Sequence, residues 1–373
     1  MPDIKSDHYD KWLGDDGPVA LVIRQHLVPA AQPDDIIFPP SYANPSEKEG
    51  DPPVYNIDGE GADSVCVIDS IPSQANRLEP MFAREPFKAL VPQTKIKFKD
   101  GLERSILDIG HRLADAAFRG TEQSESIKEA FKAFGDGDAT KIARLAPTSL
   151  VFGAWDSRET GVKIPRLINS IIRARNVVQI KRSAQYFPPI NYQSEDLLPE
   201  DLKGRPSEFG LAEAPSVHKI GGVQIKGSIT RDASLNLVAL RCLRAGASAG
   251  DIKKLRRYIL GLCLVAMAAE PDLNLRQGCL LTLDPEKGPT SELVERSGRR
   301  SPQQVTPADA AAFAKVAAED FVVGPDQTFD FDPKVFKESL DEKQAKKKAK
   351  NRGASSGAVA AGPSKDGQAE ATP

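Results

Sequence analysis

The feature that most constrains the fold of this chain is its mixture of short apolar segments. Some have the pattern of β-strands and others that of α-helices, and the two kinds do not alternate regularly. Val19 to Val28 has the composition of a strand, and Ser64 to Asp69 is a second short strand that is rich in β-branched residues. Residues 250–269 have the pattern of a helix whose last two turns are apolar on nearly every side and therefore buried. Strands and helices do not alternate regularly as in a doubly wound sheet, and no internal repeat is present. The pattern predicts an α+β core with a long insertion.

Further segments add detail to this outline. Residues 73–79 begin like a capped helix directly after the second strand. Residues 95–98 alternate like a half-exposed strand, and residues 102–119 have the apolar spacing of an amphipathic helix. Residues 188–215 are rich in proline and aperiodic, and the alternation that follows over residues 223–230 is typical of one strand with a polar face.

Charge is distributed unevenly along the 373 residues, although the net charge is only −2. Residues 1–63 carry four basic and 13 acidic side chains, a local −9, whereas residues 64–300 carry a local +8. The acidic section is therefore a candidate for contact with the basic centre of a neighbouring copy. Beyond Leu340 the chain consists mainly of Lys, Ala, Gly, Ser and Pro, which cannot bury enough apolar surface to become ordered.

The cysteines and the apolar runs indicate the compartment. The four cysteines are widely spaced and form no C-x-x-C pair, so neither a zinc site nor a disulfide framework is expected, and all four are predicted to be buried, reduced thiols. The N-terminus is polar, and the longest apolar run, residues 258–269, is far shorter than the roughly 20 residues of a membrane-spanning helix. We expect a cytoplasmic protein.

Two stretches concentrate positive charge. Residues 158–182 hold seven basic side chains and one acidic one, and residues 214–257 hold nine basic and two acidic ones. If residues 163–173 are helical, Arg166 and Arg173 lie on a polar face opposite an apolar one. Guanidinium groups bind phosphate through paired hydrogen bonds, and counterion release supplies most of the non-specific affinity for nucleic acids. The charge leaves two alternatives open, a nucleic-acid partner and a face that only contacts water.

Few side chains suggest catalysis. His111 has Asp108 three residues before it and Asp115 four residues after it, a spacing that could orient an imidazole for acid–base chemistry or form a surface ion pair. Asp69 could activate a water or hold a metal, or it could cap the turn at residues 70–73. Neither a G-x-S-x-G, nor an H-E-x-x-H, nor a P-loop motif is present. We expect no enzyme, no cofactor and no metal site.

Six segments identify a possible family. They are VCVIDSIPSQANRLEP (65–80), GHRLADAAFR (110–119), SLVFGAWDSR (149–158), KIPRLINSIIRARNV (163–177), GLAEAPSVHKIGGVQIKGSITRDASLNLVALRCL (210–243) and DLNLRQGCLL (272–281). In this order, through most of residues 18–283, the chain resembles the backbone subunit of type I-U (also called I-G) CRISPR Cascade complexes. That subunit belongs to the Cas-seven group of the RAMP superfamily.

The resemblance implies an RRM-like (ferredoxin-like) palm with inserted finger and thumb elements. Proteins of this kind stack helically along one CRISPR RNA, hold the guide by its backbone, displace a nucleotide at intervals with the thumb, and leave the other bases free to pair with target DNA. They are structural RNA-binding proteins. The alternative is a RAMP-type endoribonuclease that uses Asp69 or His111.

The resemblance also implies partners and a division of the chain. The partners are CRISPR RNA, target DNA through the guide, other copies in a head-to-tail arrangement, the large subunit, the subunits that bind and process the repeat end, and a helicase-nuclease that is recruited later. No membrane is involved. The expected division is a flexible segment over residues 1–17, one RRM-like domain over 18–340 with a thumb-like insertion at about 188–232, and a disordered tail over 341–373.

RNA contacts can be carried over residue by residue. They are Ser73, Gln74, Asn76, Arg77, His111, Arg112, Arg158, Arg166, Arg173, Arg175, Lys219, Gly221, Gly222 and Lys226. The first six should lie along one groove against the guide backbone, and the four arginines from 158 to 175 should supply the main phosphate contacts. The last four should belong to the thumb-like insertion, where the glycines would allow close approach of the RNA backbone.

Overall fold

The structure, a computed structural model, describes residues 7–32, 36–44, 53–202, 204–246, 248–270 and 272–340. The predicted disordered tail over 341–373 and the first six residues of the predicted flexible segment lie outside the described residues. No described helix is long and apolar enough to cross a membrane.

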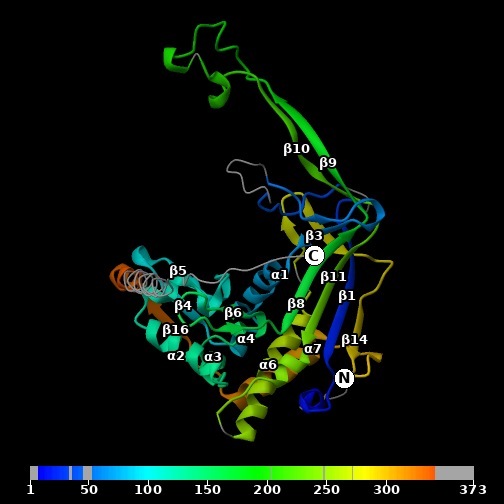
Figure 1. Cartoon of the computed structure of the whole chain (residues 1–373), viewed down its shortest axis with the longest axis vertical. Coiled ribbons are helices and arrows are strands. Elements are labelled where there is room, and N and C mark those ends of the chain that lie inside the picture. Colours follow the sequence, from blue (N-terminus) through cyan, green and yellow to red (C-terminus); the bar gives the residue numbers. More distant parts are fainter. Residues whose placement is uncertain are drawn as a thin grey trace, which may run out of the picture.

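A large, mostly antiparallel sheet forms the frame on which the other elements are placed (Figure 1). Its central strands lie in the order β13 (Cys279–Leu283), β1 (Ala20–Pro29), β11 (Ile229–Asn236), β8 (Ile168–Arg175) and β3 (Val65–Asp69). The short strands β12 (Asn274–Arg276) and β2 (Ile57–Asp58) stand at the two ends of this order, and β14 (Thr290–Val294) pairs with the first half of β1 and with β15 (Arg300–Pro302).

The strand order decides the fold. Numbered by their order in the chain, β1, β8, β11 and β13 are the first to the fourth strand. They lie side by side in the order fourth, first, third, second, and each neighbouring pair is antiparallel. Helices lie in the connection from β1 to β8 and in the connection from β11 to β13. A β-α-β-β-α-β order with these pairings is the ferredoxin-like arrangement. The predicted RRM-like α+β fold is confirmed.

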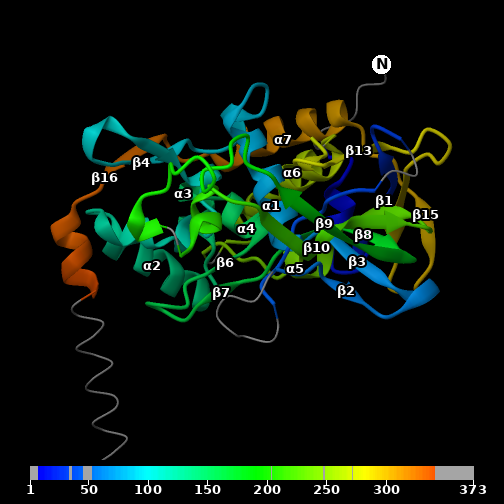
Figure 2. The ribbon, with the colours of Figure 1, turned by 90° about the horizontal axis from the view of Figure 1, so that it is seen from above.

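Helices cover one face of the sheet, and a helical lobe extends beyond it. The first connection contains α1 (Ile71–Leu78), α2 (Ser124–Gly135), α3 (Thr140–Leu145) and α4 (Thr148–Phe152), and the second contains α5 (Leu237–Arg241) and α6 (Ala249–Ala268). After the sheet, α7 (Pro307–Phe321) packs along α6, and β16 (Gln327–Asp330) pairs with β4 (Thr94–Lys97), which also pairs with β5 (Glu103–Ser105). Figure 2 shows this lobe at one end of the molecule and the sheet at the other.

A long hairpin stands away from the body as an arm. It consists of β9 (Val177–Tyr186) and β10 (Ala214–Ile225), and it is inserted between the neighbouring strands β8 and β11 (Figure 1). The arm overlaps the thumb-like insertion expected at about residues 188–232, but it begins earlier, and β11 belongs to the sheet. The polar-faced strand expected over residues 223–230 is two strands, because the backbone turns at residues 226–228 and hydrogen-bonds to Arg175 and Asn176.

Several predicted elements are confirmed, and two predictions of helix are wrong. The strands near residues 19–28, 64–69 and 95–98 and the helix near 250–269 are present. Residues 163–173 are not helical: they contain the start of β8, where Ile168, Ser170 and Ile172 are buried and alternate with partly exposed residues. The isoleucines favour this strand because branched side chains pack well on a pleated surface between two partners.

Residues 102–119 are also not an α-helix. They form β5 and three short 3₁₀ turns over Ile106–Asp108, Arg112–Ala114 and Ala116–Gly120. The Ser105 hydroxyl accepts a hydrogen bond from the backbone N–H of Leu107, and the Asp115 carboxylate accepts one from the N–H of Ala117. Such local side-chain acceptors compete with the hydrogen bonds of a continuous helix, so the helical turn restarts at each of them.

Two other expectations need correction. Tyr9 and Trp12 are buried in the core, where the Tyr9 ring lies 5.2 Å from that of Phe313, so residues 7–17 pack with the domain and are not a flexible segment. All four cysteines are free, but Cys242 is exposed, while Cys66, Cys263 and Cys279 are buried as predicted. Cys242 lies just after the short α5, where burial of Leu240 and Leu243 turns it outward.

The contact between α6 and α7 leads to a test of the core. A Cβ atom on Gly261 of α6 would lie 2.7 Å from Cα of Ala314 on α7, so Gly261→Ala should force the helices apart. We expect it to lower the free energy of unfolding by about 1–3 kcal/mol in urea denaturation. The matched control is Gly250→Ala in the first turn of the same helix, where the nearest atom is 3.5 Å away and stability should not fall. Equal stability of the two variants would contradict the close packing.

Candidate nucleic-acid interface

Polar side chains converge where β3 ends and α1 begins. The buried Asp69 carboxylate accepts hydrogen bonds from Ser73 Oγ at 2.7 Å and Gln74 Nε2 at 2.5 Å, and it pairs with Arg77 Nε at 3.1 Å. Ser70, and not Asp69, is the N-cap of α1, because its side chain accepts from the N–H of Ser73. Asp69 therefore ties α1 to the end of β3, and both of its oxygens are used by protein donors.

The same network continues beneath the sheet. Gln74 Oε1 accepts hydrogen bonds from Ser170 Oγ at 2.9 Å and from Arg231 Nε at 3.3 Å, and Arg231 Nη1 donates to Gln25 Oε1 at 2.7 Å. Arg231 is only 1% exposed, and burial lowers its pKa to about 10. These contacts join β1, β8, β11 and α1. Gln74 is buried among them, so its predicted contact with an RNA backbone is wrong for this structure.

Arg112 is a positioning residue. Its Nε lies 2.6 Å from Glu79 Oε2, Nη1 donates to the carbonyl of Gly153 at 3.1 Å, and Nη2 donates to Asn76 Oδ1 at 3.2 Å. Both Arg112 and Glu79 are buried, and burial raises the pKa of Glu79 to about 7, although the nearby Arg112 charge opposes this rise. Arg112 was expected to face the RNA, but burial keeps its guanidinium inside the protein.

The surface above Arg112 collects several of the predicted contacts. Asn76 is exposed and is held by Arg112, and the His111 side chain is 82% exposed, with Nδ1 3.4 Å from Asp115 Oδ2. Arg166 is exposed beside Gly153, and partial burial together with the Arg112 charge lowers its pKa. The fold thus brings Asn76, His111 and Arg166 to one region. For Asn76 and His111, this agrees with the predicted shared groove.

Arg173 and Arg175 lie elsewhere. They alternate along β8 with Ile172 and Ala174, which are buried. Ser170 lies on the same face of the strand as these two residues, and it contacts α1 through Gln74. Since successive strand residues point to opposite faces, Arg173 and Arg175 face away from α1. The four arginines from 158 to 175 therefore do not form one surface.

The predicted thumb contacts lie at or near the base of the arm. Lys219 pairs in register with Arg182 across the hairpin, and Lys226 is exposed at the turn into β11. Gly222 has φ +105°, and a Cβ there would lie 2.9 Å from the carbonyl oxygen of Ile37. At Gly221 a Cβ would meet the Arg182 side chain. Both glycines allow close approach of other protein segments, and their contact with RNA stays a prediction.

The basic stretch over residues 158–182 is not neutralised by the fold. Among the residues that the structure describes, none of its seven basic side chains forms an ion pair, and all but the half-buried Arg173 are exposed. They are Arg158, Lys163, Arg166, Arg173, Arg175, Lys181 and Arg182. Glu159 is the one acidic side chain of the stretch, and its Oε2 lies 3.6 Å from Nζ of Lys128, which is outside the stretch. Within the described part of the chain, the positive charge of this stretch is therefore exposed and unpaired.

The second basic stretch, over residues 214–257, is largely used inside the molecule. Arg231 is buried in the network described above, and Arg241 donates to the carbonyls of Trp12 and Pro18. Lys253 and Arg257 both pair with Asp10, at 3.0 and 2.8 Å. The acidic N-terminal section therefore meets the basic region of its own chain at Asp10, and this second cluster is mostly structural.

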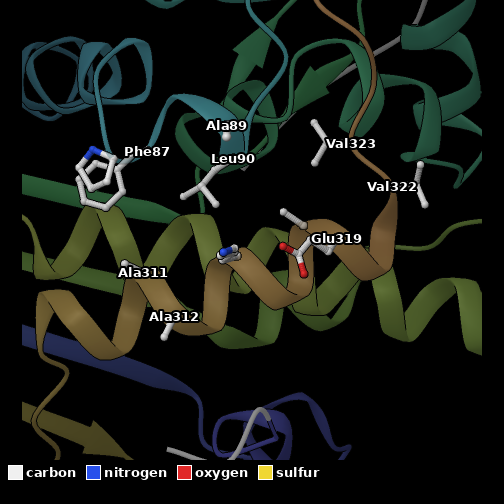
Figure 3. Close-up of a pocket in the computed structure, with 11 residues that line it drawn as sticks. Phe87, Ala89, Leu90, Ala311, Ala312, Glu319, Val322 and Val323 are labelled. Atoms are coloured by element: carbon white, nitrogen blue, oxygen red, sulfur yellow. The ribbon is translucent and has the colours of Figure 1, made fainter.

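A groove beside α7 does not resemble a catalytic site. It has a volume of about 820 Å³ and lies between α7 and residues 86–90, with Phe87, Leu90 and Val323 among its apolar lining (Figure 3). Its charged lining residues are Lys315 and Glu319 alone. Within the described ranges, no group of three or more His, Cys, Asp or Glu side chains is placed to hold a metal.

Comparison with known proteins returns a family match for part of the chain. Residues 21–179 match the family described as CRISPR-associated protein GSU0053. The match includes nearly all of β1, together with β3, α1 to α4 and β8, and it supports the resemblance to a CRISPR-associated family over those residues. The search among curated proteins returned no match.

A solved structure is also similar. It is a chain of a "CRISPR RNA-guided surveillance complex, pre-nicking", with 11% identity and a TM-score of 0.36, covering 87% of this chain and 99% of that one. Because a TM-score this low does not place two chains in one fold, the fold assignment rests on the strand order of the sheet.

The buried pair of Arg112 and Glu79 yields a prediction about stability. Arg112→Met leaves a buried carboxylate without its partner and should lower the free energy of unfolding by about 3–5 kcal/mol. Adding Glu79→Leu removes that carboxylate, so the double variant should recover much of the loss, as measured by urea denaturation of both proteins. A double variant that is less stable than Arg112→Met would show that the charge pair is not what the single change disrupts.

Proposed function

We propose that the protein is a non-catalytic, guide-RNA-binding backbone subunit of a type I-U/I-G Cascade complex. Several copies would line one CRISPR RNA and present it for pairing with target DNA in antiviral defence. The observation that carries the proposal is the unpaired positive charge of residues 158–182, in a chain that matches a CRISPR-associated family over residues 21–179. Guanidinium and ammonium groups without carboxylate partners are available to bind phosphate.

Two groups of basic residues are proposed as the phosphate contacts. Arg158 and Arg166 form the hairpin group: Arg158 lies in the loop of the short hairpin before β8, and Arg166 follows that hairpin beside Gly153, to whose carbonyl Arg112 donates. Arg173 and Arg175 form the strand group, which lies on the other face of β8 near the arm. Contacts with phosphate position an RNA without reading its sequence, which suits a subunit whose guide supplies the specificity by base pairing.

The arm supports the proposal of assembly from several copies. Its outer part exposes large apolar side chains, with Phe187, Leu197 and Phe209 all more than half exposed. Such a projecting apolar surface indicates a protein partner. A contact between the arm of one copy and a different surface of the next is heterologous, and contacts of that kind generate open helical arrays.

The geometry argues against Asp69 as the base of an endoribonuclease. Asp69 is buried, and its two oxygens accept from Ser73, Gln74 and Arg77. A general base needs an accessible position beside the proton that it removes, and Asp69 lacks one. His111 is exposed and lies beside the Asp115 carboxylate, so this argument does not apply to it. The geometry therefore supports a non-catalytic role for Asp69 alone.

Removal of the proposed phosphate contacts should weaken RNA binding in a salt-dependent way. Arg158→Ala with Arg166→Ala, and separately Arg173→Ala with Arg175→Ala, should each lower the affinity for single-stranded RNA. Each pair should also reduce the slope of log affinity against log salt by roughly 1.4, which is about 0.7 for each lost contact. Fluorescence anisotropy with labelled RNA at several salt concentrations measures both quantities.

The control is Lys95→Ala with Lys141→Ala. These exposed lysines carry the same charge but pair with Glu103 and Glu129 on the helical lobe. If the control and both arginine pairs leave the slope unchanged, the assignment of the phosphate contacts is wrong. If one arginine pair alone reduces the slope, only that group, the hairpin group or the strand group, contacts the RNA.

The identity of the RNA can be tested in cells. Full-length protein purified from cells that carry a repeat–spacer array should bring with it discrete guide RNAs of repeat and spacer sequence, detected by sequencing. The variants that lose both arginines of a contacting pair should recover less of this RNA than the Lys95→Ala, Lys141→Ala control does. Recovery of random cellular fragments, or of no RNA, would contradict the proposed role in guide binding.

A further inference from the structure

One exposed tryptophan is not explained by the phosphate contacts. β6 (Ala154–Trp155) and β7 (Lys163–Ile164) form a short hairpin directly before β8. The Trp155 side chain is 60% exposed, and Nζ of Lys163 lies 5.7 Å from its ring centroid. The chain has only one other tryptophan, Trp12, which is fully buried.

The hairpin that carries Trp155 is well held. The Asp156 carboxylate is buried and accepts hydrogen bonds from the N–H groups of Glu159 and Thr160 and from the Thr160 hydroxyl. Ala154 and Ile164, the rung beside Trp155, are buried in the main core. An exposed indole on such a support is presented in a defined position, and the entropy cost of ordering it on binding is small.

The surroundings of the indole are cationic. Arg158, Lys163 and Arg166 lie in or next to the hairpin and have no ion-pair partner among the described residues. The nearby carboxylates are occupied, since Asp156 holds the loop and Glu159 contacts Lys128. A flat aromatic face among unpaired cations is the arrangement that stacks on a base and contacts the adjoining phosphates of a single strand.

An apolar protein partner fits this site less well. Interfaces between proteins gather several apolar side chains around an aromatic anchor. Between residues 103 and 177, Trp155 is the only described large apolar side chain that is exposed, and the apolar side chains of the arm form a separate group. An isolated aromatic ring in positive surroundings therefore favours a nucleotide.

We propose that Trp155 stacks on a base of the single-stranded RNA that the protein binds, while Lys163 and Arg158 contact the adjoining phosphates. This inference rests on the proposed function and adds a base contact to it. Every base presents an aromatic face, so the contact tolerates any guide sequence. It also means that each copy holds one base in a defined place.

Intrinsic fluorescence tests the proposal. Trp12→Phe leaves Trp155 as the only tryptophan, and it loses no hydrogen bond within the described structure because the Trp12 indole N–H has no partner there. Single-stranded RNA should quench the emission of Trp155, whereas abasic RNA of equal length, which has the same phosphates, should not. Equal quenching by the two polymers would overturn the stacking contact.

Affinity gives a second measurement that does not depend on the Trp12 variant. In the otherwise wild-type chain, Trp155→Ala should weaken binding of single-stranded RNA by about tenfold to a hundredfold, and Trp155→Phe should retain most of the affinity. Leu102→Ala, which removes another exposed apolar side chain, is the control and should bind like wild type. Wild-type affinity in Trp155→Ala would overturn the stacking contact and leave the proposed function standing. A wild-type protein that binds no RNA would overturn both.

Discussion

The hydrogen-bond network from Gln25 through Arg231 and Gln74 to Asp69 holds the candidate interface in place. Buried guanidinium donors need acceptors, and Arg231 finds them for Nε and Nη1 on β1, β8 and α1, whereas its Nη2 has no partner among the described residues. Because Gln74 accepts from Arg231 and donates to Asp69, α1 cannot shift on the sheet without breaking several buried hydrogen bonds at once. Asn76 lies on that helix, so its position and that of the Arg112 guanidinium bonded to it depend on α1.

The same principle, satisfaction of buried polar groups, explains which basic residues reach the surface. Arg112, Arg231 and Arg241 are buried and take acceptors from the protein, and each joins segments that are distant in the chain. The stretch over residues 158–182 is different, because it lies on a short hairpin, an outer strand face and the arm, where few carboxylates are near. Basic side chains that pair with no group of the protein are available to bind a polyanion. The presence or absence of such pairing distinguishes the structural cluster from the candidate interface.

The hydrophobic pattern of a segment predicted its secondary structure correctly where contacts from elsewhere in the chain did not override that pattern. The strand of residues 64–69 and the helix of residues 250–269 were predictable, because β-branched composition and an all-round apolar surface have few other solutions. Residues 102–119 have helical spacing, yet Ser105 and Asp115 supply local acceptors that break the helix into turns. Residues 163–173 have a spacing compatible with a helix, but pairing with β3 and β11 makes them part of a strand. Trp155 was not singled out from the sequence, because a lone tryptophan is more often buried than exposed.

The sequence by itself determined the α+β class, the uneven distribution of charge, the main strands, the long buried helix and the resemblance to a CRISPR-associated family. These depend on composition and on local order along the chain, which are present before the chain folds. Only the tertiary structure decided which side chains are available to a ligand. Gln74 and Arg112 turned inward, Arg166 came to lie beside Gly153 while Arg173 lies on the face of β8 away from α1, and Trp155 was exposed. The physical reason is that exposure and neighbourhood depend on contacts between segments far apart in the chain, such as Arg112 with Gly153 and Arg231 with Gln25.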